Sequence, residues 1–195
     1  MAIAVNFDFD KRQERVLLNT LKSLQKQAPR MISFAVSDTL RKGKTLLKSE
    51  VAKHLNLKAG AIARDIRSFK SGSLGGRLIV MSKSAKSLTA FKGARQTKVG
   101  VTVQVRKREP REMHKRAFIA RGKGGIRQVF RRTADPNNPG RLVPRTPIER
   151  LGGPTPYGII KEKPGVMSKV QKELGDVYLV ALTQKVDSVL RQTRS

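Results

Sequence analysis

The stretch that decides the fold is Met113-His-Lys-Arg-Ala-Phe-Ile-Ala-Arg-Gly-Lys-Gly-Gly-Ile-Arg-Gln-Val-Phe-Arg-Arg-Thr133. Within it, two short apolar and aromatic runs flank the segment Arg121-Gly-Lys-Gly-Gly125. Glycine adopts the positive φ angles of a tight hairpin at no steric cost. The stretch therefore predicts a β-hairpin over residues 116–132, with its turn at the glycines.

Side chains along a strand alternate between the two faces of a sheet. On the first strand of the hairpin, Ala117 and Ile119 share one face, and Phe118 and Ala120 share the other. On the second strand, one face has Ile126, Gln128 and Phe130, and the other has Arg127, Val129 and Arg131. We therefore expect the hairpin to pack one face and to present basic groups close by.

Residues 99–105 show the clearest periodicity in the chain. Valines at 99, 101, 103 and 105 alternate with Gly100, Thr102 and Gln104, which is the pattern of a half-buried strand. The apolar run at 77–81 is another strand candidate. With the hairpin, these segments predict one mostly antiparallel sheet of about four strands.

Apolar residues recur at helical spacing on both sides of this predicted sheet. We expect a helix at residues 11–27 and a second from Arg30 to Leu55 that bends or breaks at Gly43. A third helix is expected at 58–69. The side chains that it would bury are Ile62, Ile66 and Phe69.

The C-terminal half contains a long irregular segment and one more helix. Prolines and glycines predict a loop over 134–164, and an apolar stripe predicts a helix over 165–192 that covers one face of the sheet. The predicted fold is thus a single α+β domain. Its parts are N-terminal helices in residues 1–70, an antiparallel β-sheet with an extended hairpin in 76–133, the loop, and a C-terminal helix packed on the sheet.

The charge balance is the most unusual feature of the composition. The 195 residues include 42 Lys and Arg against 14 Asp and Glu, a net charge of +28. Such a field attracts polyanions, and nucleic acid is the commonest of these partners. The alternative is that the charge offsets acidic neighbours inside a larger assembly.

Other classes of protein are disfavoured by the sequence. Cysteine is absent, so disulfides and thiolate chemistry are excluded. No apolar run approaches the ~20 residues of a membrane span. The first residues lack the basic and long apolar regions of a signal peptide, so we expect none and no membrane partner.

Residues 50–66 have the spacing of a helix-turn-helix. The turn would be Asn56-Leu57, and Lys58 and Arg64 would be placed to meet DNA. Any pair of short packing helices satisfies the same pattern, and that interpretation is the simpler one.

The hairpin allows two interpretations of its aromatic residues. Phe118 and Phe130, interleaved with arginines, could form a platform on which nucleotide bases stack. The same strand spacings suit core aromatics beside solvated arginines equally well.

No pattern in the chain is typical of a catalytic site. The glycine segment at 121–125 lacks the following helix and the Lys-Ser/Thr of a phosphate-binding loop. The two histidines, His54 and His114, lie in different elements, and no His or carboxylate cluster has metal-ligand spacing. We therefore expect no enzyme activity, no metal and no cofactor.

Several segments, in order, resemble phage minor tail proteins of the lambda Z type. The hairpin strands Ala117-Phe-Ile-Ala-Arg121 and Val129-Phe-Arg-Arg-Thr133 carry the resemblance first. Downstream, Gly140-Arg-Leu142 and Thr146-Pro-Ile-Glu-Arg-Leu-Gly-Gly-Pro-Thr155 are similar to a Gly-Arg-Leu-Pro-Ile segment that ends in Gly-Pro-Ser. The chain differs there by an insertion after Leu142 and by Thr155 in place of Ser. Upstream, the similar segment is Phe91-Lys-Gly-Ala-Arg-Gln-Thr-Lys-Val-Gly-Val-Thr-Val103.

The resemblance implies a structural virion protein at the head-proximal end of a phage tail. Such a subunit is expected to form a ring with copies of itself, with sixfold symmetry, around the channel that double-stranded DNA crosses. Its other partners would be tail terminator, tail tube and head-connector proteins. It would be assembled in the cytoplasm of the host bacterium and would end up in the virion, at the tail or neck.

The candidate subunit-interface or DNA-channel residues are basic groups in and before the hairpin. They are Arg106, Lys107, Arg108, Arg116, Arg121, Lys123, Arg127, Arg131 and Arg132. In the predicted loop, an apolar anchor of Pro147, Ile148 and Leu151 is the candidate interface. We expect the hairpin and the loop to reach adjacent subunits. Two other functions remain open, namely a basic DNA-binding regulator and an RNA-binding protein of ribosomal type.

Overall fold

The computed structural model describes residues 2–7, 28–71, 75–81, 84–122, 124–132 and 148–192. The fold is α+β with antiparallel sheets and a long C-terminal helix, as predicted. The chain divides into two compact units. Unit 1 comprises Met1–Glu50, Ala63–Ser82 and Ile160–Ser195, and unit 2 comprises Val51–Ile62 and Lys83–Ile159.

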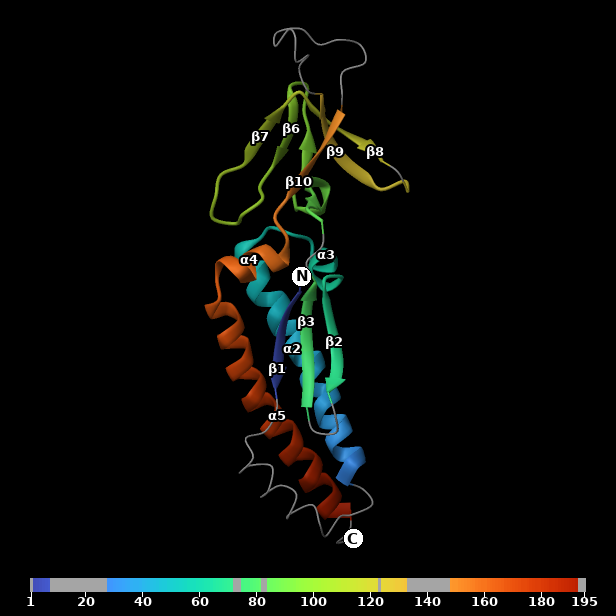
Figure 1. Ribbon diagram of the computed structural model, residues 1–195, viewed down its shortest axis with the longest axis vertical. Helices are drawn as coiled ribbons and strands as arrows, with labels where there is room; N and C mark the ends of the chain where they lie inside the picture. Colours follow the sequence, from blue (N-terminus) through green and yellow to red (C-terminus); the bar gives the residue numbers. More distant parts are fainter. Residues whose placement is uncertain are drawn as a thin grey trace. The chain divides into compact units, whose positions relative to one another are not determined.

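Unit 1 combines a three-stranded sheet with two long helices (Figure 1). Its strands are β1 (Ala2–Phe7), β2 (Ile66–Ser71) and β3 (Gly75–Met81), in the antiparallel order β1-β3-β2. Its helices are most of α2 (Ala28–His54) and α5 (Gly165–Gln192).

The core of unit 1 lies between the sheet and these helices. On β3, Leu78 and Val80 are fully buried, and so are Leu47 of α2 and Leu174 of α5. Two ion pairs also join the helices: Lys169 to Glu50 at 3.3 Å and Lys185 to Asp38 at 3.9 Å. The apolar stripe predicted for the C-terminal helix is therefore the side of α5 that is packed.

Helix α2 is continuous through Gly43, where the sequence left a bend or break open. Gly43 is buried, and an added Cβ would lie 2.5 Å from Leu174 Cδ2 and 2.7 Å from Leu78 Cδ1. The absence of a side chain at Gly43 lets α5 and β3 pack close to α2. Close packing, and not a kink, therefore explains why this position is glycine. The predicted helix at 11–27 lies outside the described residues.

The predicted third helix is wrong beyond its first turn. Helix α3 is only Ala59–Ala63, and Ile66 begins strand β2. The spacing of Ile62, Ile66 and Phe69 fits a helix, but pairing with β3 overrides this local preference. Phe69 is consequently 47% exposed, although Ile62 and Ile66 are buried as expected.

The N-terminal part is also less helical than predicted, because it contains strand β1. This strand pairs along the whole of β3 except Gly75.

Unit 2 contains two small antiparallel sheets (Figure 1). One has the order β5-β6-β7, from Arg95–Gln96, Gly100–Val103 and Glu112–Lys115. The other has the order β4-β10-β9-β8, from Lys86–Ser87, Ile148–Gly153, Arg127–Arg132 and Ala117–Arg121. A 3-10 turn, η2 (Leu88–Ala90), and α3 complete it, with α4 (Pro156–Glu162) beginning in this unit.

Three predictions for this region need correction. The strand at 99–105 and the hairpin belong to different sheets, because β6 pairs with its neighbours β5 and β7. Of its valines, Val101 and Val103 are fully buried, whereas Val99 is 59% exposed. The predicted loop contains β10 and α4 in its second half, and 134–147 lies outside the described residues. Strand β10 is stabilised by its pairing with β9, a segment distant in the sequence. The proline and glycine content of 134–164 therefore did not predict this strand.

Candidate functional site

The hairpin is formed as predicted. Strands β8 and β9 pair with Phe118 opposite Phe130 and Ile119 opposite Val129. Gly124 and Gly125 have φ angles of 83° and 73°, in the left-handed region that favours glycine. The Gly125 N–H donates to the Gly122 carbonyl at 3.0 Å and closes the turn.

One face of the four-stranded sheet is packed into unit 2. Val129 is fully buried there, with Ile119 and Leu151 beside it in register. On the same face, Gly153 lies so close to Phe91 that an added Cβ would be 2.6 Å from the ring. This core face explains the apolar half of the hairpin pattern.

The opposite face carries the aromatic residues, and we call it the aromatic face. Residues that are directly paired in an antiparallel sheet point to the same side. The register therefore places seven side chains together on this face: Phe118, Ala120, Gln128, Phe130, Arg132, Ile148 and Arg150. All seven are half-buried or exposed. The aromatic residues are thus neither core residues nor free on the surface, and this was the question that the sequence left open.

The two rings lie side by side on this face. Their centroids are 6.0 Å apart and their planes are tilted by 32°. The Arg132 guanidinium lies over the Phe118 ring, 5.7 Å from its centroid, in a cation–π contact. Arg150 is directly opposite Phe130 in the register. The aromatic face is therefore a surface of rings and guanidinium groups.

Acidic groups are on the other side of the sheet. Glu149 pairs with Arg131, whose Nε donates to Glu149 Oε1 at 2.7 Å. Both residues point to the core-face side, at its exposed margin. Among the described residues, no carboxylate forms an ion pair with Arg132 or Arg150. The positive charge of the aromatic face is therefore not neutralised by the part of the chain that the structure describes.

The structure brings some predicted site residues together and separates others. Arg121 and Arg127 are directly opposite at the end of the hairpin, and both are exposed. Arg131 and Arg132 point to opposite faces of the sheet. Lys123 and Pro147 lie outside the described residues. Of the predicted anchor, Ile148 is 53% exposed on the aromatic face, whereas Leu151 belongs to the core face.

The basic residues before the hairpin lie outside the strands, in the connection between β6 and β7 and just after β7. Arg106 bridges to Leu55 and forms an ion pair with Glu109 at 3.6 Å. The backbone of Lys107 donates to the His54 carbonyl at 3.1 Å, and Arg108 is exposed in the same turn. Arg116, at the β7–β8 junction, has a φ of 60° and donates its N–H to the Val99 carbonyl at 3.0 Å. This set is separate from the aromatic face.

Arg150 is the residue of the aromatic face that the sequence did not predict. In Ile148-Glu-Arg-Leu151, apolar residues do not alternate, because Ile148 and Leu151 point to opposite faces. Period-2 alternation, the usual strand signal, is therefore missing. The only signal was the set of segments in the family resemblance, which includes this stretch.

The structure does not form the helix-turn-helix. Helix α3 has five residues, which is too short to lie along a major groove. The ammonium of Lys58 donates to the Thr89 carbonyl at 3.2 Å. Residues 50–66 instead include Leu55 and Leu57, whose side chains are buried and whose backbones form isolated β-bridges to Arg106 and Phe91 of unit 2. The simpler interpretation, packing, is the one this segment fits.

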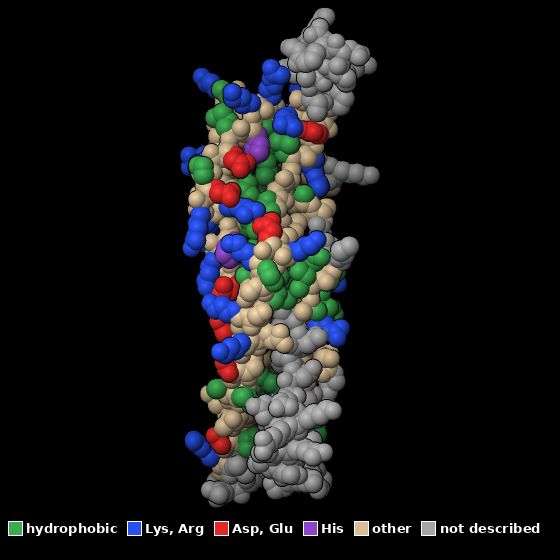
Figure 2. Space-filling view, turned by 60° about the vertical axis from the view of Figure 1, so that its left-hand side comes forward, with side chains coloured by type: hydrophobic (Ala, Val, Ile, Leu, Met, Phe, Trp, Pro, Cys, Tyr) green, Lys and Arg blue, Asp and Glu red, His purple; other side chains and the backbone are tan. Residues whose placement is uncertain are grey.

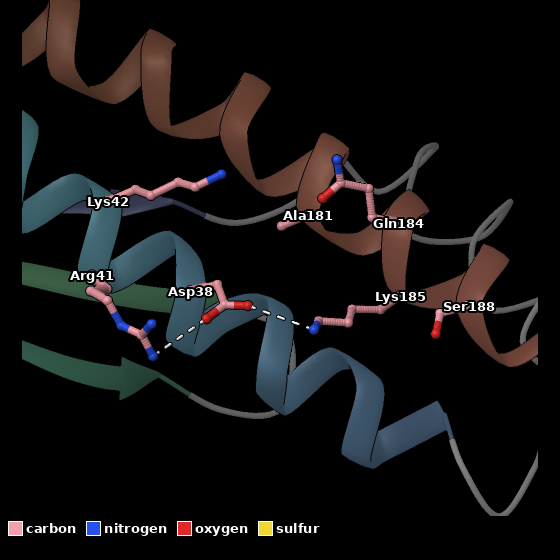
Figure 3. Close-up of a pocket in the computed structure, with 7 residues that line it drawn as sticks. All are labelled: Asp38, Arg41, Lys42, Ala181, Gln184, Lys185 and Ser188. Atoms are coloured by element: carbon pink, nitrogen blue, oxygen red, sulfur yellow. Dashed lines mark ion pairs between the residues drawn. The ribbon is translucent and has the colours of Figure 1, made fainter.

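Unit 1 has a pocket of about 230 Å³ between α2 and α5 (Figure 3). Asp38 lies in its wall between two cations, 3.5 Å from Arg41 and 3.9 Å from Lys185. The residues that line it are Asp38, Arg41, Lys42, Ala181, Gln184, Lys185 and Ser188. Asp38 pairs with two of the three basic groups but balances only one of their charges, so the pocket keeps a positive charge and resembles an ion-paired groove between helices.

Groups suited to metal binding are not brought together in the described part of the chain. No cluster of three or more His, Cys, Asp or Glu there could hold a metal ion. His114 has its Nε2 3.8 Å from Glu112, in an exposed strand. Among the described residues, no helix is long and apolar enough to cross a membrane.

On the face that Figure 2 shows, Lys and Arg side chains are spread over the described part of the chain, with fewer Asp and Glu between them. Sequence position and charge alone therefore do not select a site, and the aromatic face is distinguished by its combination of rings and guanidinium groups.

Comparisons with protein-family models, with curated proteins and with solved structures found no match to this chain.

Proposed function

We propose that the protein is a structural virion subunit that completes the head-proximal end of a phage tail and takes part in joining tail to head. The observation that carries this proposal is that three segments of the resemblance lie next to one another in the fold. Strands β8, β9 and β10 contain three segments of the tail-protein resemblance, and they are adjacent in one sheet, while the upstream segment at 91–103 belongs to the β5-β6-β7 sheet and 140–142 lies outside the described residues. Segments that resemble one family in order and are adjacent in the fold support a common origin more than scattered matches do.

Exposed apolar side chains support a role in an assembly. In unit 2, apart from the residues of the aromatic face, Val99 is 59% exposed, Met113 49% and Ile126 62%. Large apolar groups that lie in water in a monomer become favourable contacts when a partner covers them. A ring of identical subunits, proposed to be sixfold, would cover them.

The charge fits the neighbours that this position implies. A chain of +28 repels other copies of itself, so anions close by would stabilise a ring. Double-stranded DNA in the channel would supply them, and so would acidic faces of terminator, tube and connector proteins. The proposed location is the tail or neck of the virion.

The direct test of the proposal is to look for the chain in purified phage particles. We expect it to co-purify with tails, and we expect negative-stain images of the isolated protein to show rings. If the chain is absent from particles and is monomeric at all concentrations, the proposal is wrong.

Shortening the hairpin turn tests which part reaches a neighbour. Deletion of Gly124 and Gly125 removes exposed turn residues around which an added Cβ would meet no atom within 4 Å. We expect the variant to keep its circular dichroism spectrum and solubility but to yield tails that do not join heads, measured as a loss of infectious titre.

Gly175→Ala, on an open part of α5, is the control and should leave the titre unchanged. A folded deletion variant that still gives infectious particles would show that the hairpin tip does not make the contact.

A further inference from the structure

We propose that the aromatic face binds single-stranded nucleic acid, with bases stacked on Phe118 and Phe130 and phosphates held by Arg132 and Arg150. This activity goes beyond the proposed virion role and does not rest on it. It follows from the geometry of one sheet face in unit 2.

The sheet has the architecture that such binding requires. One face is packed against the core, so the strands are held in place, and the other face is half-buried or exposed. Two aromatic residues lie on adjacent strands of that face, opposite each other in register. Aromatic side chains on neighbouring strands of a four-stranded sheet can each stack one unpaired base.

The rings are placed to accept two bases separately. Their centroids lie 6.0 Å apart and their planes are tilted by 32°, so the two rings do not form a face-to-face sandwich. A base has a planar π-face whatever its sequence, which makes such stacking tolerant of sequence. Bases in a duplex are already stacked and paired, so a single strand is the favoured ligand.

The cations are placed for the phosphates. Arg132 is already at one ring, 5.7 Å from the Phe118 centroid, and Arg150 is opposite the other ring on β10. Guanidinium groups bind phosphate through two N–H donors and also stack on bases. Glu149, the neighbouring carboxylate, points to the other side of the sheet and pairs with Arg131. No acidic side chain from the described strands of this sheet therefore opposes an anion on the aromatic face.

Ile148 suits a different ligand, a protein partner, because it is apolar and 53% exposed. Protein interfaces are also enriched in aromatic residues and arginine. The aligned rings, the two guanidinium groups and the absence of a neighbouring carboxylate on the described strands favour a polyanion with planar groups. Docking of a protein is therefore an outcome of the test and not the proposal.

The experiment measures binding of the full chain to a fluorescent oligothymidylate of about 12 nucleotides. A DNA duplex of the same length and an oligouridylate are measured in parallel, each at several salt concentrations. We expect the single strands to bind more tightly than the duplex at high salt, because stacking survives screening and phosphate contacts do not. Equal salt dependence and equal affinity for single strand and duplex would overturn the proposal.

The variant F118L/F130L keeps apolar side chains on the face and removes both rings. We expect it to bind oligothymidylate at least about tenfold more weakly, with duplex affinity unchanged within about twofold. The control is F34L, because Phe34 is 51% exposed and Arg30 lies 5.7 Å from its ring centroid, as Arg132 does at Phe118. F34L should bind both ligands as the unaltered chain does.

A second variant covers the case in which F118L/F130L does not fold. R132Q/R150Q should lower the slope of log affinity against log salt by about 1.4, because each phosphate that the protein neutralises on a single strand adds ~0.7 to that slope. R67Q/R95Q removes the same charge from exposed positions elsewhere and should lower that slope less.

Equal slopes for the two charge variants would overturn the proposal, as would F34L weakening binding as much as F118L/F130L. If F118L/F130L binds oligonucleotides normally but is missing from phage particles, the face docks a protein and the proposal is wrong.

Discussion

Gly100→Ala is expected to abolish the pairing of β6 with β7 and to lower the free energy of unfolding of unit 2 by about 3 kcal/mol or more. An added Cβ at Gly100 would lie 2.2 Å from the His114 carbonyl oxygen and 3.0 Å from Lys115 Cα. Both are backbone atoms of the paired strand, so no side-chain rotation relieves the overlap. The strands would have to separate, which breaks the ladder that joins residues 100–103 to 112–115.

Hydrogen exchange measures this effect strand by strand. In Gly100→Ala, the amides of β6 and β7 should lose their protection, while those of the unit 1 sheet should keep theirs, because that sheet belongs to the other compact unit. Thr102→Ala is the control on the same face of the same strand, and it should cost less than about 1 kcal/mol. A Gly100→Ala variant with unchanged protection in β6 would contradict the register.

Gly43→Val is expected to destabilise unit 1 by about 3 kcal/mol through overpacking. The new Cβ would approach Leu174 Cδ2 to 2.5 Å and Leu78 Cδ1 to 2.7 Å. Both leucines are fully buried, so their methyl groups cannot turn into solvent. The gain of up to ~1 kcal/mol from removing a helical glycine is smaller than this cost.

The matched control is Gly175→Val, a glycine in α5 around which an added Cβ would meet nothing within 4 Å. It should stabilise the chain by a few tenths of a kcal/mol, because valine has the better helix propensity. Urea unfolding followed by circular dichroism measures both changes, and they should have opposite signs. The double variant Gly43→Val/Leu174→Ala should lose less stability than the sum of its parts, since the second change removes the nearest methyl groups. Additive losses would show that α5 does not pack at Gly43.

These two glycines show the limit of reasoning from the sequence. Gly43 was identified as a possible bend and Gly100 as one residue in an alternating strand. Neither interpretation identified the real constraint on these positions. At each, atoms of another segment lie so close that they leave no room for a Cβ. The sequence does not show whether a glycine is needed for a turn of the backbone or for the close approach of another segment.

The sequence by itself determined the elements whose signal is local. The hairpin follows from two β-rich runs around glycines that must adopt positive φ, and α5 follows from an apolar stripe that continues along residues 165–192. The α+β class follows from having both. For the candidate site, the alternation of the hairpin already placed Phe118 opposite in face to Ile119, and the basic residues were evident from composition.

Only the tertiary structure decided which strands share a sheet, which face of the hairpin is open, and that β2 and β10 are strands at all. Residues 66–69 have helical spacing, and 148–151 have none, yet both pair along a partner strand. Hydrogen bonds to a partner strand stabilise an extended backbone whatever the local preference, and neither of these two strands has the alternating pattern that would mark it in the sequence. Arg150 therefore lies on the aromatic face because β10 pairs with β9, and no local pattern in the sequence predicts that pairing.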